Sequence, residues 1–149
     1  MQREANRRFG FSADKTLKLA QTLYERHKAI TYPRTDSRCL PPDMREKALN
    51  ALRHLPPQYH PLLKAPAFDP HMDSKRFYDA SKVSDHHAII PTDHRPGALT
   101  ADEMSLYDLI VRSLIAAHYP DYAYESARLR VVVNGHEFRA DGAVPMDLG

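Results

Sequence analysis

The 149-residue sequence has a single cysteine and no long apolar run. Cys39 has no second cysteine with which to form a disulfide or a cysteine-based zinc site, which excludes disulfide-stapled and zinc-ribbon proteins. No apolar run approaches the roughly 20 residues that span a membrane, and residues 1–8 lack the apolar stretch of a secretory signal. We therefore expect a soluble, cytoplasmic protein with no membrane partner.

The charge is unevenly distributed along the chain. The formal net charge is only +2, but residues 1–53 hold 12 of the 21 basic and 6 of the 19 acidic residues. A basic half in a nearly neutral chain favours a surface that faces a polyanion. A solvated helical face rich in Lys and Arg explains the same composition.

Three stretches have the spacing of helices. Ser12 or Asp14 can cap a helix that runs to about Lys28, and a second helix is expected to begin near Pro42, since proline suits a first turn. Residues 100–103 have the form of a capping box. They open a helix with apolar residues at helical spacing, namely Leu106, Tyr107, Ile110, Val111, Leu114 and Ile115. Between the second and third helices, 7 of the 12 prolines fall within residues 56–96, which predicts mostly loop.

The carboxyl-terminal part reads as a β-hairpin. Residues 127–133 alternate in polarity, and the Asn134-Gly135 pair is a strong two-residue turn signal before residues 136–140. The predicted class is therefore mainly α (α+β). A lone two-stranded ribbon is marginal in water, so we expect a fragment of a larger protein whose sheet continues past Gly149.

Residues 30–37, Ile-Thr-Tyr-Pro-Arg-Thr-Asp-Ser, concentrate side chains that suit phosphate chemistry. A tyrosine attacks phosphorus as its phenolate, which a nearby cation stabilises. Positions two apart in an extended stretch point to the same side, so Tyr32 and Arg34 can address one phosphate, with the guanidinium as a planar fork. The alternative is a Tyr-Pro turn with a surface arginine.

A second candidate lies in the proline-rich section, where Asp85-His86-His87 precedes Ala-Ile-Ile-Pro-Thr. A histidine can donate a hydrogen bond to a phosphate or carry a proton near neutral pH. Adjacent histidines point differently, so one of the two would serve a given site. A metal role is disfavoured because no cysteine partners and no His-x-x-x-His pair accompany them, and loop or core histidines remain the alternative.

Taken together, the two segments resemble the type IA DNA topoisomerases, and specifically the bacterial topoisomerase III branch. The family signature around its nucleophile, Ile-Thr-Tyr-x-Arg-Thr-Asp-Ser, is matched by residues 30–37, with Pro33 at the variable place as in that branch. Residues 2–13 and 16–25 are similar to the helices that precede the signature, and residues 86–92 to the family's His-x-Ala-Ile-x-Pro-Thr/Ser block. Cys39 stands where an aromatic residue is expected, and residues 143–149 look atypical.

The resemblance implies a role for each matched residue. Tyr32 would attack a phosphodiester of single-stranded DNA and form a 5′-phosphotyrosyl link, with Arg34 and His86 as the other catalytic residues at that phosphate. Seven further residues are predicted to bind DNA: Thr31, Thr35, Asp36, Ser37, Arg7, Arg8 and Lys15.

It also implies a division of the chain and of the chemistry. Residues 1–125 would form the catalytic-tyrosine domain, related to the winged-helix group, and residues 126–149 the start of an adjoining β arch domain. The family's Mg²⁺ is held by an acidic Asp-x-Asp-x-Glu domain, and this sequence has no such cluster. The implied partners are single-stranded DNA and the rest of a topoisomerase chain, with possible pairing of the truncated hairpin with another chain. The chain alone is expected to be inactive, and the full protein to be bacterial and associated with the nucleoid.

Two other functions fit part of the pattern. Asp85-His86-His87 occurs in DHH-type phosphoesterases, but these need further aspartates on a parallel sheet, and no βαβ alternation precedes this segment. A winged-helix DNA-binding regulator without catalysis would explain the basic half and the hairpin, but it assigns no function to residues 31–36.

Overall fold

The computed structural model describes residues 1–72 and 74–147. They divide into two compact units, Met1–His118 and Tyr119–Gly149. This division falls a few residues before the 125/126 boundary that the resemblance implies. The described residues contain five α-helices and one two-stranded antiparallel sheet, so the α+β class is confirmed.

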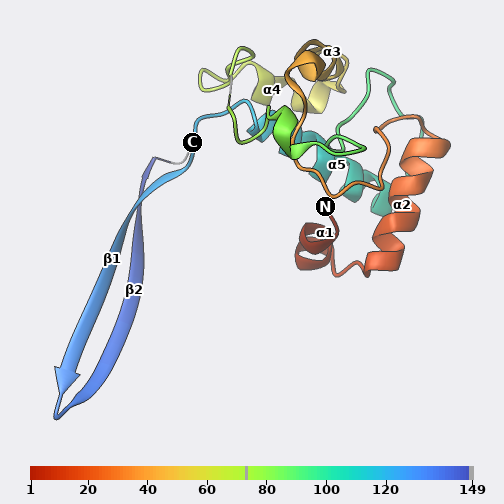
Figure 1. Cartoon of the computed structure of the whole chain (residues 1–149). Coiled ribbons are helices and arrows are strands. Elements are labelled where there is room, and N and C mark those ends of the chain that lie inside the picture. Colours follow the sequence, from red (N-terminus) through yellow and green to blue (C-terminus); the bar gives the residue numbers. More distant parts are fainter. Residues whose placement is uncertain (73, 148–149) are drawn as a thin grey trace. The chain divides into compact units, whose positions relative to one another are not determined.

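Three helices pack together in the first unit, α1 (Gln2–Phe9), α2 (Ala13–Glu25) and α5 (Ala101–Ala116). Figure 1 shows α1 near the first turn of α2, and α5 packs against both helices. Gly10 ends α1 in the left-handed conformation, at φ 68°, which glycine adopts without strain. Ser12 then caps α2, because its Oγ accepts the Lys15 N–H at 3.1 Å. The Ser12 cap is confirmed, although α2 ends a turn earlier than predicted.

Helix α5 supplies more buried apolar residues to this unit than any other helix. The predicted capping box is present: Glu103 Oε2 accepts the Thr100 N–H at 2.8 Å, and Thr100 Oγ1 accepts the Glu103 N–H at 3.3 Å. The hydrogen bond from the Thr100 N–H is the main cause that lowers the Glu103 pKa from its ordinary value. Seven apolar residues of α5 are buried: Leu106, Tyr107, Leu109, Ile110, Val111, Leu114 and Ile115.

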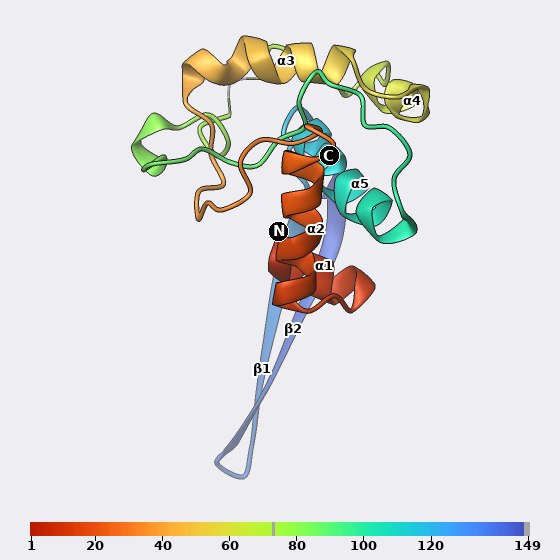
Figure 2. The same ribbon diagram turned by 90° about the vertical axis from the view of Figure 1, so that its right-hand side faces the viewer.

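The chain between α2 and α5 is mostly irregular, as its prolines predict. A 3-10 turn at Pro42–Met44 leads into α3 (Arg45–Arg53), and α4 (His60–Leu63) is a single turn. Short 3-10 turns lie at Pro57–Tyr59 and Ala80–Lys82. Figure 2 shows α3 and α4 following one another along one side of this unit.

His118 is the last residue of the helical unit and is fully buried. Its Nδ1 lies 2.9 Å from the Leu114 carbonyl, which can only accept, so Nδ1 carries the proton. Its Nε2 then accepts the Tyr78 hydroxyl at 3.1 Å. Burial lowers the pKa of His118, which keeps the ring neutral.

The second unit is a hairpin of β1 (Ala123–Val133) and β2 (His136–Asp147). Asn134 and Gly135 both have positive φ, 50° and 81°, so the predicted two-residue turn is confirmed. Both strands extend beyond the predicted residues, and the pairing includes Ala143 opposite Ser126. All described residues of both strands are exposed, and no third strand joins them within the described ranges.

Among the residues that the structure describes, no helix combines the length and the apolar character needed to cross a membrane.

Candidate functional site

The candidate catalytic residues lie on two segments that run beside each other. We call residues 30–37 the tyrosine segment and residues 86–92 the histidine segment. Ile30 and Pro91 form an antiparallel bridge, in which the Thr31 N–H donates to the Ile90 carbonyl at 2.9 Å and the Thr92 N–H to the Ala29 carbonyl at 3.0 Å. Ile30, Ile90 and Pro91 are buried. The tyrosine segment is therefore fixed against the histidine segment by backbone pairing over a buried apolar base.

Threonine hydroxyls reinforce this pairing. Thr31 Oγ1 accepts the Ile90 N–H at 3.0 Å and donates to the Ala88 carbonyl at 3.4 Å. Thr35 Oγ1 donates to the His86 carbonyl at 2.9 Å. Each hydroxyl satisfies a backbone group that the single bridge leaves unpaired, so Thr31 and Thr35 fix the relative placement of Tyr32 and His86.

The pairing brings the rings of Tyr32 and His86 into contact. Their centroids are 4.5 Å apart with an interplanar angle of 49°. His86 is exposed and Tyr32 is 38% exposed, so both rings are open to a ligand. His87 is half-buried, and its Nδ1 lies 2.7 Å from the Ala88 carbonyl. Of the two adjacent histidines, His86 is thus the one beside the tyrosine.

A further ring, which the sequence analysis did not assign to the site, completes this cluster. Tyr24, in the last turn of α2, meets the Tyr32 ring edge-on, at 5.6 Å between centroids and 82° between planes. The sequence pattern places Tyr24 within the helix expected to run to about Lys28 and gives it no further role. No spacing rule could show that the chain folds back after α2, because that depends on the conformation of Lys28, which has φ 52°.

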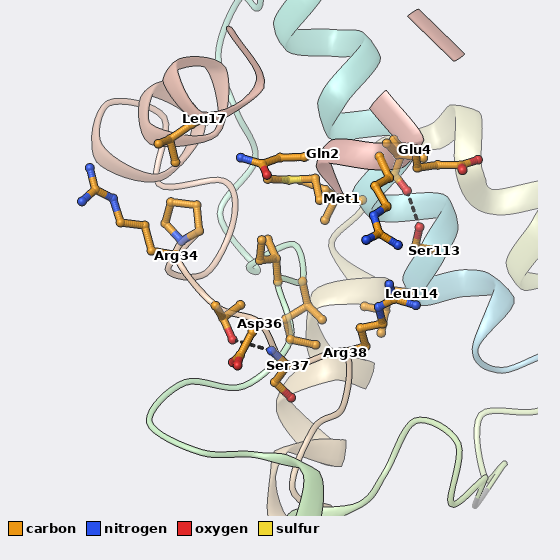
Figure 3. A pocket seen from close by; sticks show the side chains of 18 of the residues that line it. Met1, Gln2, Glu4, Leu17, Arg34, Asp36, Ser37, Arg38, Ser113 and Leu114 are labelled. Carbon is orange, nitrogen blue, oxygen red and sulfur yellow. Dashed lines mark hydrogen bonds between the residues drawn. The ribbon is translucent and has the colours of Figure 1, made fainter. Parts of the chain in front are cut away.

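Arg34 lies on the exposed loop that follows Tyr32, after the buried Pro33. It forms no hydrogen bond or ion pair within residues 1–72 and 74–147. Figure 3 shows its guanidinium extending away from Asp36 and Ser37. Its side chain is therefore available to an anion, while convergence of Arg34 with Tyr32 and His86 on one phosphate stays a prediction.

The rest of this loop is anchored through Ser37. The Ser37 hydroxyl donates to the Lys82 carbonyl at 2.9 Å and accepts the Cys39 N–H at 3.2 Å, while Asp36 remains exposed. Cys39 is buried, with Sγ 3.5 Å from the Arg76 carbonyl. The loop borders a cavity of about 820 Å³ whose polar lining is drawn in Figure 3 and includes Gln2, Glu4, Arg34, Asp36, Ser37 and Arg38.

The three cations predicted to bind DNA from the first helices each have an acidic partner. Both Arg7 and Arg8 pair with Glu4, at 2.5 Å to the same carboxylate oxygen. The hydrogen bond from Arg7, followed by that from Arg8, lowers the pKa of Glu4 to about 2. Lys15 pairs with Asp102 at 2.7 Å and lies 4.2 Å from the centroid of the Phe11 ring. All three ion pairs are partly exposed, so a phosphate could still compete for the cations.

No group of three or more His, Cys, Asp or Glu side chains that could hold a metal ion occurs among the described residues. The two paired segments thus present the Tyr32 phenol and the His86 imidazole in contact, with the Arg34 guanidinium nearby in the chain and without an acidic partner among the described residues. These are groups that suit nucleophilic attack on a phosphodiester.

Comparison with known proteins agrees with this chemistry. A family model described as DNA topoisomerase matches residues 1–149, so the chain belongs to the DNA topoisomerase family. It is 41% identical over 152 residues to DNA topoisomerase 3 of Bacillus thuringiensis (strain Al Hakam). It is 39% identical over 155 residues to DNA topoisomerase 3 of Bacillus subtilis (strain 168).

Each of these alignments includes 100% of this chain, which spans only 21% of the length of the relative. The resemblance to the topoisomerase III branch is thus confirmed. The matches favour it over a winged-helix regulator.

Proposed function

We propose that this chain is the nucleophile-bearing part of a longer type IA topoisomerase of the topoisomerase III branch. The proposed activity is cleavage and rejoining of single-stranded DNA, for strand passage, relaxation of negative supercoils or decatenation. The observation that carries the proposal is the contact between Tyr32 and His86, which lie on distant segments joined by the bridge and the threonine hydroxyls. Membership of the family supports it.

In the proposed reaction, the phenol oxygen of Tyr32 bonds to the phosphorus of a phosphodiester as the bond from phosphorus to O3′ breaks. The phenol proton passes to water, and the leaving 3′ oxygen takes up a proton to become a free hydroxyl. The 5′ phosphate stays on Tyr32, and the bond energy is kept in the phosphotyrosyl ester. Attack by the same 3′ hydroxyl reverses the step, so resealing needs no ATP.

Arg34 and His86 stabilise the transition state in this proposal. The guanidinium of Arg34 has no acidic partner within the described ranges, so it can take two phosphate oxygens as a planar fork. His86, with its ring against Tyr32, donates one hydrogen bond to the same phosphate. Groups that are fixed in place before the charge develops contribute most to such stabilisation. The bridge between Ile30 and Pro91 supports this role, because it fixes the two segments that carry these residues.

The remaining candidates would guide the strand to Tyr32. Asp36 and Ser37 border the site on the loop, while Thr31 and Thr35 act through the backbone of the histidine segment. For Arg7, Arg8 and Lys15, DNA contact requires exchange of an internal carboxylate for a phosphate, so their contribution is expected to be smaller and sensitive to salt.

The other catalytic components would come from outside this chain. Mg²⁺, bound by an acidic domain of the full protein, would neutralise phosphate charge. The helical unit would correspond to the winged-helix-related tyrosine domain, and the exposed hairpin to the beginning of the arch domain. Single-stranded DNA and the rest of the chain are the proposed partners, and the bacterial cytoplasm, at the nucleoid, the proposed location. This chain alone would be inactive.

Covalent capture tests the proposal. In the full-length protein with Mg²⁺ and end-labelled single-stranded DNA, we expect a protein–DNA adduct that Tyr32→Phe abolishes, with binding of the oligonucleotide nearly unchanged. Phe keeps the ring and its packing but lacks the only oxygen at this position. An undiminished adduct in Tyr32→Phe would refute the assignment.

A further inference from the structure

The ring of Tyr32 is held from two sides. His86 contacts it at 4.5 Å between centroids, and Tyr24 meets it edge-on at 5.6 Å and 82°. We propose that Tyr24 is a positioning residue, which fixes the Tyr32 ring for attack through its own ring and not through its hydroxyl. This inference rests on the proposed role of Tyr32 as the nucleophile.

Tyr24 stands on a rigid support. It belongs to the last turn of α2, next to the fully buried Leu23. The turn after the helix is closed by two hydrogen bonds, from the His27 N–H to the Thr22 carbonyl at 3.1 Å and from the Ala29 N–H to the Leu23 carbonyl at 2.9 Å. The distance between Tyr24 and the start of the tyrosine segment is therefore set by backbone bonds.

The turn also holds the Tyr24 ring itself. Lys28, in the left-handed conformation, places its Nζ 5.9 Å from the centroid of the Tyr24 ring. The Lys28 carbonyl accepts the Thr92 hydroxyl at 2.6 Å, which ties this turn to the segment that follows His86. Tyr24 is thus oriented by a cation at one contact and by Tyr32 at another.

A nucleophile in this position needs such support. Tyr32 is 38% exposed, and an exposed tyrosine without neighbours exchanges among staggered χ1 rotamers. Attack requires the phenol oxygen to be in line and close to the phosphorus, so each rotamer that points elsewhere lowers the reactive fraction. Edge-to-face and tilted ring contacts on two sides restrict those rotamers. The Tyr24 hydroxyl has no hydrogen bond to a described residue, which leaves the ring as the contact that matters.

Variants at position 24 test this in the full-length protein with labelled single-stranded DNA and Mg²⁺. We expect Tyr24→Phe to retain the single-turnover cleavage rate within about twofold, while Tyr24→Leu and Tyr24→Ala lose about tenfold, the order of effect of one aromatic pair. The dissociation constant for the DNA should stay unchanged in all three. Phe9→Ala is the matched control, because it removes an exposed ring that contacts another ring, that of the buried Phe11, at 5.3 Å between centroids. It should cleave at the normal rate.

The outcomes separate this inference from the function on which it rests. An adduct that persists in Tyr32→Phe refutes the proposed function itself. If Tyr32→Phe forms no adduct but Tyr24→Leu cleaves at the normal rate, the positioning role of Tyr24 is refuted. A loss in Tyr24→Phe equal to that in Tyr24→Leu refutes the role of the ring, and weaker DNA binding in proportion to the rate would make Tyr24 a DNA contact. An equal loss in Phe9→Ala would reduce the effect to general packing. Tyr24→Leu keeps apolar volume and serves if Tyr24→Ala does not fold.

Discussion

Replacing Thr31 by valine should destabilise the site at the point where its two segments join. Valine keeps the shape of threonine but cannot accept the Ile90 N–H, which Thr31 Oγ1 accepts at 3.0 Å. Ile90 is only 3% exposed, so water cannot replace the lost acceptor. An unpaired buried donor costs about 1–3 kcal/mol, a large share of the roughly 5–15 kcal/mol that stabilises a typical domain.

Urea unfolding of the chain, followed by helical circular dichroism, measures this cost. Thr22→Val is the matched control, because the Thr22 hydroxyl donates at 3.1 Å to the Lys18 carbonyl of its own helix and leaves no buried donor when removed. The control should stay within about 0.5 kcal/mol of the wild type. Equal unfolding midpoints for Thr31→Val and Thr22→Val would refute the reasoning. In the full-length protein, Thr31→Val should also slow cleavage, since Thr31 directly precedes Tyr32 and anchors its backbone.

Two further changes separate catalysis from stability. Arg34→Ala should lower the cleavage rate by about 10²–10³-fold, as when one charge-stabilising donor is removed. Arg34→Lys should recover part of the rate, and His86→Ala should lose less than Arg34→Ala. The urea midpoint should not change, and a normal cleavage rate in Arg34→Ala would contradict the role of Arg34. Lowering the pH should destabilise the helical unit, because the pKa of buried His118 is lowered while the unfolded chain takes up that proton near pH 6.5. The contribution of neutral His118 to the stability of the folded chain is fully present above about pH 6.5 and is lost as the pH falls toward the pKa of the folded state. His118→Asn should flatten the change in urea midpoint between about pH 7.5 and 5.5, and an unchanged slope would contradict this.

Local chemistry made several elements of the fold predictable. The capping box at 100–103 and the Asn134-Gly135 turn each depend on neighbouring residues alone, and both are present. The pairing of Glu4 with Arg7 and Arg8 follows i,i+3 and i,i+4 spacing and could have been read from the sequence. A count of charges does not reveal these pairs, because it ignores the spacing of the residues.

Contacts between residues far apart in the sequence do not follow from local sequence patterns. Thr35 and His86 are 51 residues apart, and no periodicity links them; only the family resemblance suggested that the two segments belong together. The pairing of Lys15 with Asp102 likewise requires α2 and α5 to be packed first. The position of Tyr24 beside Tyr32 depends on the left-handed conformation of Lys28. A lysine in the sequence does not predict that conformation, which is typical of glycine.

The most direct measurement is the identity of the residue that carries the DNA. The covalent adduct formed by the full-length protein on single-stranded DNA would be trapped with denaturant, digested with protease and nuclease, and analysed by mass spectrometry. We predict one modified peptide, with a 5′-phosphate-linked nucleotide on Tyr32, and a released DNA fragment with a free 3′ hydroxyl. Attachment to any other residue, or through a 3′ phosphate, would contradict the assignment of Tyr32 as the nucleophile.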